Sequence, residues 1–229
     1  MGLILNIETA TTVCSVSLAK DGLLLALKEQ DGDYSHAENL TLFIEHVVKE
    51  AGVKLSDIDA VAISKGPGSY TGLRIGVSAA KGLCYALNKP LIAVDTLQYL
   101  SLSVSRVDAR VGLFCPMFDA RRMEVYCAIY DSLNNLIRPT AAEIIDENSF
   151  SDLLDKNTVF FFGNGAEKCM SMFSKNKNAV FIKDIVPSAE GMIALSENSY
   201  KLGQFENVAY FEPFYLKDFI AGKKKKEVL

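Results

Sequence analysis

The chain has 229 residues, 49% of them hydrophobic and 23% charged, with a formal net charge of −4 at pH 7. This predicts a soluble protein with one large domain or two small ones, and the negative charge argues against binding nucleic acid through the overall field of the chain. The five cysteines form no C-x-x-C pair, and no apolar run reaches the ~20 residues of a membrane helix, so we expect reduced thiols and a cytoplasmic location.

The first half of the chain alternates strand and helix signals in a defined order. Three strands are predicted over residues 3–9, 13–20 and 23–30, followed by a helix that ends at Gly52 and carries an apolar stripe. A buried strand at 60–64 then leads into a helix at 70–87. A strand at 91–94 and a helix from Leu97 complete the order βββαβαβα.

The second half repeats this order without a visible repeat of residues. Strands are predicted at 111–118, 124–130, 136–140, 158–162 and 180–182, with helices near 147–154, 165–173 and 188–202. The order is that of the ribonuclease-H-like lobe of the actin, sugar kinase and Hsp70 superfamily. We therefore predict an α/β protein of two tandem lobes, each a mixed sheet flanked by helices: residues 1–104, a smaller lobe at 105–217, and a disordered basic tail at 218–229.

The loop before the helix at 70–87 is rich in glycine. Gly66, Pro67, Gly68 and Ser69 lie where the strand turns into the helix, which presents backbone N–H groups at a helix start. The glycine spacing matches neither a P-loop nor the dinucleotide-binding fingerprint. The loop is therefore either a site for a ligand or partner, or a structural turn that needs positive φ.

Several segments resemble one family. The run GPGSYTGLRIG at 66–76 is similar to the signature of the TsaB family, formerly YeaZ, and so are ILNIET at 4–9, HAENL at 36–40, DARRMEVY at 119–126 and PFYLK at 213–217. The resemblance implies a non-catalytic scaffold that activates TsaD in forming N6-threonylcarbamoyladenosine at position 37 of tRNAs reading codons that start with adenine. It also implies the ATPase TsaE as a partner, tRNA contact through the complex, and a homodimer in isolation.

The candidate chemical groups are few. His36 and His46 are ten residues apart on one predicted helix and cannot share an ion, so we expect no metal and no cofactor. Nucleotide candidates are Glu8 and Thr9 at the end of the first strand, and Gly163 and Gly165 in a loop of the second lobe, although a polar strand end and a plain turn are the readings that the residues favour. An actin-like ATPase or a glycoprotease-like peptidase acting alone therefore stays open. The adjacent Arg121 and Arg122 are either solvated or in contact with a partner or tRNA.

The helix at 70–87 has little side-chain bulk, because Gly72, Gly76 and Ala80 follow at four-residue intervals. Glycine inside a helix costs about 1 kcal/mol relative to alanine, so a close contact must offset the loss. That contact is either the lobe's own sheet or a partner helix. The resemblance implies that the first-lobe helices bind TsaD, through His36, Leu40, Phe43, Val47, Thr71, Gly72, Ile75, Gly76, Ala79, Ala80 and Leu83.

Overall fold

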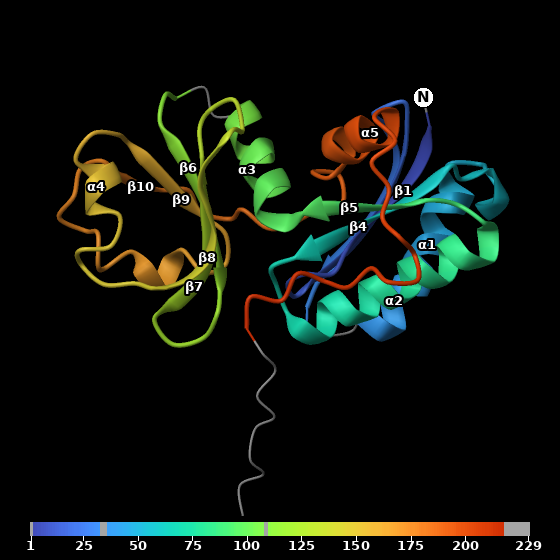
Figure 1. Cartoon of the computed structure of the whole chain (residues 1–229), viewed down its shortest axis with the longest axis horizontal. Helices are drawn as coiled ribbons and strands as arrows, with labels where there is room; N and C mark the ends of the chain where they lie inside the picture. Colours follow the sequence, from blue (N-terminus) through green and yellow to red (C-terminus); the bar gives the residue numbers. More distant parts are fainter. Residues whose placement is uncertain (1, 33–35, 108–109, 218–229) are drawn as a thin grey trace, which may run out of the picture.

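The computed structural model describes residues 2–32, 36–107 and 110–217, and these form two lobes side by side (Figure 1). The basic tail predicted at 218–229 lies outside the described residues. The elements of the first half are β1 (Leu3–Glu8), β2 (Val13–Lys20), β3 (Leu23–Asp31), α1 (His36–Glu50), a 3₁₀ turn at Leu55–Asp57, β4 (Ala60–Gly66), α2 (Tyr70–Leu87), β5 (Leu91–Asp95) and α3 (Thr96–Val107). Those of the second half are β6 (Leu113–Asp119), β7 (Glu124–Tyr130), β8 (Leu136–Ile144), α4 (Ser151–Leu154), β9 (Val159–Phe162), a 3₁₀ turn at Glu167–Cys169, β10 (Ala179–Phe181) and α5 (Ile193–Lys201).

The two sheets have the same topology. The first has strand order β3-β2-β1-β4-β5 and the second β8-β7-β6-β9-β10. In each, the hairpin-connected strands pair antiparallel, whereas the strands joined through intervening segments pair parallel. The predicted fold of two mixed sheets flanked by helices is therefore confirmed.

Strand β1 is buried along its whole length because helices cover both faces of its sheet. Leu5 and Ile7 pack in the core beneath α1 and α2. Ile4 points to the opposite face, into a core that it shares with Phe114 and Phe160 of the second sheet. The two lobes are thus joined by continuous apolar packing.

Helix α3 lies between the two sheets, whereas α5 packs on the first sheet. α3 contacts β6 and β7 as well as β4 and β5, and α5 contacts β1 and β5. The sequence prediction grouped α5 with the second lobe, and this is wrong. Ala189 anchors the segment before α5 on β2, because its N–H donates to Ser15 Oγ at 2.9 Å and its carbonyl accepts from Ser17 Oγ at 3.0 Å.

Three predicted helices of the second half are shorter than expected, and the one predicted at 188–202 is α5, which begins only at Ile193. The helix predicted near 147–154 is only α4, because Phe150 has a left-handed backbone, with φ of 60°, and cannot continue a helix. The segment predicted as a helix at 165–173 contains only a 3₁₀ turn with flanking turns. The apolar residues that predicted a helix are nevertheless buried, because Cys169 and Phe173 lie on the core side of the segment.

The last described residues, 203–217, are called here the C-terminal segment. Figure 1 shows it returning from α5 past the first sheet and along α2. The Glu206 N–H donates to the Leu91 carbonyl at 2.8 Å, and the Phe214 N–H donates to the Lys65 carbonyl at 2.7 Å. Among the described residues, no helix has the length and apolar character needed to cross a membrane.

Candidate functional site

The end of β1 holds a fully buried carboxyl group. Glu8 Oε2 accepts a hydrogen bond from the Tyr99 hydroxyl of α3 at 2.5 Å, and Oε1 accepts one from the Ala10 N–H. Burial raises the pKa of Glu8 to about 7, and the hydrogen bonds from Tyr99 and Ala10 only partly oppose that rise. Burial also raises the pKa of Tyr99 well above its ordinary value. Glu8 and Tyr99 therefore join the first sheet to the helix between the lobes.

This arrangement leaves neither first-lobe nucleotide candidate open to a ligand. Both Glu8 and Thr9 have no exposed surface, and both oxygens of Glu8 accept bonds from the chain itself. Thr9 Oγ1 donates to the Gly72 carbonyl at 2.8 Å. The expectation that these side chains line a nucleotide site is not met in this conformation, because the chain's own groups occupy them.

Close packing accounts for the two glycines of the second-lobe loop. Gly163 has φ of +96°, and a Cβ there would lie 2.5 Å from the Met117 carbonyl oxygen. A Cβ on Gly165 would lie 2.7 Å from the carbonyl carbon of Phe118. The loop packs closely against the end of β6, and both glycines are needed for that contact rather than for a ligand.

The glycine-rich loop makes its contacts within the chain. Gly66 has φ of +109° and donates its N–H to Thr96 Oγ1 at 3.0 Å. A Cβ on Gly68 would overlap the Ala10 carbonyl oxygen, which accepts the Ser69 N–H at 2.6 Å. Ser69 Oγ caps α2 through the Gly72 N–H. These contacts give residues 66–69 a structural task, holding α2 to the connection between β1 and β2.

Most of the predicted partner interface faces inward. A Cβ on Gly72 would overlap the Thr9 carbonyl oxygen, and one on Gly76 would overlap Thr9 Oγ1 and lie 2.9 Å from Ile63 Cδ1. The small residues therefore let α2 approach its own sheet. The predicted interface residues that are buried in this way, and so cannot line a partner surface, are His36, Leu40, Phe43, Val47, Gly72, Gly76 and Ala80.

Four of the predicted residues remain accessible and form one edge of α2. Thr71 is exposed, and Ile75, Ala79 and Leu83 are half-buried, one per turn of the helix. We call these four residues the α2 ridge. Beside it, Gly82 is exposed and has no heavy atom within 4 Å of an added Cβ. A hollow of about 360 Å³ opens at the end of the neighbouring α1, lined by Ile44, Glu45, Val48, Lys49, Val53 and Leu55.

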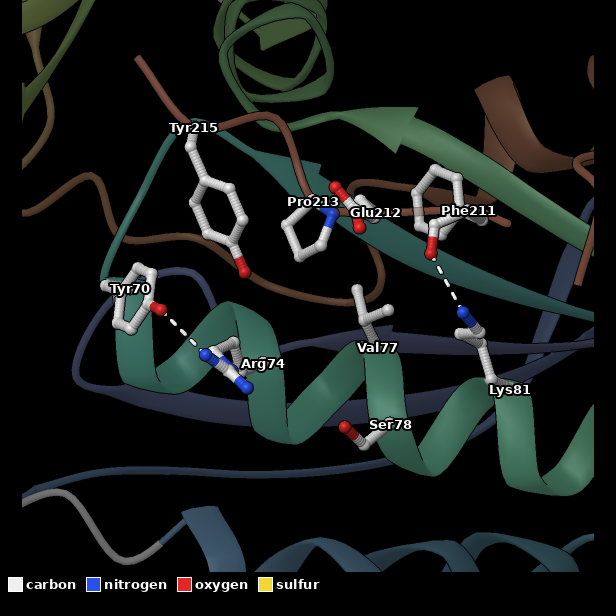
Figure 2. Close-up of a pocket in the computed structure, with 9 residues that line it drawn as sticks. All are labelled: Tyr70, Arg74, Val77, Ser78, Lys81, Phe211, Glu212, Pro213 and Tyr215. Carbon is white, nitrogen blue, oxygen red and sulfur yellow. Dashed lines mark hydrogen bonds between the residues drawn. The ribbon is translucent and has the colours of Figure 1, made fainter. Parts of the chain in front are cut away.

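The other edge of α2 forms a groove with the C-terminal segment. The sequence did not predict this groove. Figure 2 shows Tyr70 and Arg74 on α2 facing Pro213 and Tyr215 across a cavity of about 460 Å³. Arg74 Nη1 donates to the Tyr70 hydroxyl at 2.6 Å, and the rings of Tyr70 and Tyr215 lie 5.1 Å apart. The sequence offered one signal for this groove, namely that residues 66–76 and 213–217 both resemble family motifs. That resemblance does not indicate that the two segments are in contact.

Lys81 of α2 forms hydrogen bonds with the C-terminal segment. Its Nζ donates to the Phe211 carbonyl at 2.9 Å and to the Ala209 carbonyl at 3.2 Å (Figure 2 draws the first). Within the described ranges, no three His, Cys, Asp or Glu side chains gather in a way that could hold a metal ion.

Two tandem lobes of the same sheet topology define a fold of the actin-like kind. At the level of fold alone, the chain is similar to the activator of 2-hydroxyisocaproyl-CoA dehydratase from Clostridium difficile, with a TM-score of 0.51 and 8% identity over 88% of this chain and 97% of that one. The family model of TsaD, tRNA N6-adenosine threonylcarbamoyltransferase, matches residues 32–224.

Two further relatives match nearly the full length. The tRNA threonylcarbamoyladenosine biosynthesis protein TsaB of Escherichia coli (strain K12) is 31% identical over 96% of this chain and 97% of its own length. The structure of YeaZ from Pseudomonas aeruginosa has a TM-score of 0.80 and 26% identity, covering 94% of this chain and 100% of that one. The chain therefore belongs to the TsaB (YeaZ) branch of this family, as its motifs indicated.

Proposed function

We propose that this chain acts in the formation of N6-threonylcarbamoyladenosine in tRNA as a non-catalytic partner that binds and activates TsaD. Its membership of the TsaB branch over nearly the full length supports the pathway. The observation that carries the partner role is the α2 ridge, a line of small and apolar side chains that pack partly on the first core and leave the rest of their surface accessible.

The buried carboxyl of Glu8 at the end of β1 supports a non-catalytic role for the chain. In a nucleotide-hydrolysing relative of this fold, a carboxylate at this position must reach the metal or the attacking water. Here Glu8 is buried and its two oxygens accept bonds from Tyr99 and Ala10. The alternative, an ATPase or peptidase acting alone, would require this site to open.

The α2 ridge suits a helix of the partner. Ala79 and the adjacent Gly82 add little bulk, so a second helix could approach the backbone closely, while Ile75 and Leu83 offer apolar contacts. We place TsaD on this ridge. In its absence a second copy of the chain can use the same face as a homodimer, TsaE joins the complex with TsaD, and tRNA is reached through the complex.

The test is a charge placed in the α2 ridge. Ala79→Glu should leave the isolated chain folded, because Ala79 is only half-buried at the edge of the first core, but should abolish co-elution with TsaD, since an unpaired carboxylate would be desolvated in the contact. Ser171→Glu, an exposed position of the second lobe, is the matched control and should bind TsaD normally. Normal TsaD binding by a folded Ala79→Glu chain would place the interface elsewhere.

A further inference from the structure

The hairpin between β6 and β7 carries two arginines in a backbone conformation that arginine rarely adopts. Arg121 has φ of 70° and Arg122 has φ of 49°, and both side chains are exposed. Asparagine and glycine adopt this left-handed region far more readily. Two consecutive arginines at such positions suggest that their side chains matter for something other than folding.

The hairpin backbone is fixed by its own hydrogen bonds. The Arg121 N–H donates to Asp119 Oδ1 at 2.9 Å, and the Ala120 N–H donates to the Glu124 carbonyl at 3.0 Å. The Glu124 N–H donates to the Arg121 carbonyl at 3.2 Å, and this hydrogen bond closes the turn. The tip therefore presents its two guanidinium groups on a rigid support. We call residues 119–124 the arginine hairpin.

The acidic groups beside the arginines are already paired with lysines. Asp119 forms an ion pair with Lys168, and Glu124 forms one with Lys217 of the C-terminal segment. In the part of the chain that the structure describes, neither arginine side chain forms an ion pair or a hydrogen bond. Four cations thus stand against two carboxylates at this tip, although the whole chain has a net charge of −4.

A neighbouring tyrosine, Tyr126, lies among these charges. Burial raises its pKa and the charge of Glu124 adds to the rise, while the charges of Lys217 and Arg121 oppose it. The tip is therefore a local basic site on an acidic protein.

The arginine hairpin also lies close to the start of α2, at the edge that faces the C-terminal segment. Lys217 joins the hairpin to the C-terminal segment, and Tyr215, two residues earlier, contacts Tyr70 at the start of α2. Two residues span at most about 7 Å of chain. The hairpin is therefore joined through the C-terminal segment to the helix whose opposite edge is assigned to TsaD.

We propose that the arginine hairpin binds the phosphate backbone of the tRNA that is held by the complex with TsaD. Guanidinium groups bind phosphate oxygens in pairs of hydrogen bonds, and an exposed turn reaches a backbone without reading bases. This inference rests on the proposed function, and it adds a direct contact between this chain and RNA.

The test uses a variant that removes both charges while easing the turn. Arg121→Asn combined with Arg122→Gly should fold at least as well as the wild type, because both new residues accept positive φ. In complex with TsaD, its affinity for tRNA, measured by fluorescence anisotropy, should fall about tenfold, and the slope of log K against log salt should drop by about 1 to 2. Lys175→Asn, an exposed cation elsewhere in the second lobe, should change neither quantity.

Co-elution with TsaD separates the two proposals. If the wild-type chain does not co-elute with TsaD, the proposed function fails. The same salt series is then run on the isolated wild-type chain and the isolated double variant, and a loss of tRNA affinity in the variant alone would still support RNA binding by the hairpin. If the complexes form but the double variant keeps the wild-type affinity and slope, the hairpin does not bind RNA. An equal loss in the Lys175→Asn complex would also overturn the inference, because the effect would then be one of net charge alone.

Discussion

Glu8 is a fully buried carboxyl whose protonation the fold changes. Its pKa is about 7 in the fold instead of the ordinary 4.5, because burial disfavours the charged form. The folded state therefore holds a proton that the unfolded chain has released between pH 4.5 and 7. The free energy of unfolding should decrease as pH rises through this window, by about 3 kcal/mol in total from this one group, and stay constant with respect to it above pH 7.

Glu8→Gln tests this link between burial and stability. Glutamine cannot ionise and keeps an oxygen that can accept the Tyr99 bond, so the variant should gain stability relative to wild type as pH is raised from 5 to 8. Urea unfolding at both pH values gives the difference. Parallel pH profiles for the two proteins would show that Glu8 titrates normally.

Two glycines of α2 make a matched pair. Gly76→Ala should destabilise the chain by about 1–3 kcal/mol, because the new Cβ would overlap Thr9 Oγ1 and crowd Ile63. Gly82→Ala should stabilise it by up to about 1 kcal/mol, because its Cβ enters open space and alanine favours helix. Thermal melts of the two variants should shift in opposite directions. Shifts of the same sign would contradict the packing described for α2.

The sequence could show that α2 needs small residues but not which neighbour they meet. The four-residue spacing of Gly72, Gly76 and Ala80 marks one side of the helix, and both the lobe's own sheet and a partner helix would require it. Contacts with Thr9, 63 residues from Gly72, decide between them. Such long-range contacts leave no periodic signal in the chain.

At the scale of elements, α2 is bordered by an accessible ridge on one edge and by the C-terminal segment on the other. The segment has little regular structure and is held by the packing of Val208 and Phe211 on the first core and by a few hydrogen bonds, among them the two that Lys81 donates to its carbonyls. Hydrogen bonds from charged donors contribute about 1.5–3 kcal/mol when partly buried.

Lys81→Met should therefore loosen the C-terminal segment without unfolding the lobes. The thioether side chain keeps much of the apolar packing but donates no bond, so amide hydrogen exchange should accelerate over residues 205–217 and stay unchanged in β1 and β4. Lys54→Met, an exposed lysine of the first lobe, is the control. Unchanged exchange in the segment would show that Lys81 does not hold it.

Element order was readable from the sequence, whereas the partners of the last elements were not. Alternation and helical spacing located β2, α2 and β7 at their observed bounds. The same spacing shows only that α5 has a buried face, and it cannot say that this face meets β1 and β5 instead of the second sheet. In the segment at 165–173, successive turns bury the same residues that a helix would have buried.

At the scale of the whole molecule, the two lobes share a core in which Ile4 and Ile92 of the first sheet meet Phe114 and Phe160 of the second. The Glu8–Tyr99 bond lies at the same junction. An actin-like enzyme needs its lobes to move apart around a nucleotide, and here apolar packing and a buried carboxyl oppose that movement. We therefore expect no ATP turnover above background by the isolated chain, measured as phosphate release, and turnover abolished by Glu8→Gln would contradict this expectation.

The most direct test of the partner role is reconstitution of tRNA modification. TsaD, TsaE, unmodified tRNA and a threonylcarbamoyl donor are combined with and without this chain, and N6-threonylcarbamoyladenosine is measured in the digested tRNA. We predict modification only when the wild-type chain is present, with background levels for the folded Ala79→Glu variant. Equal modification with and without the chain would contradict the claim that it activates TsaD.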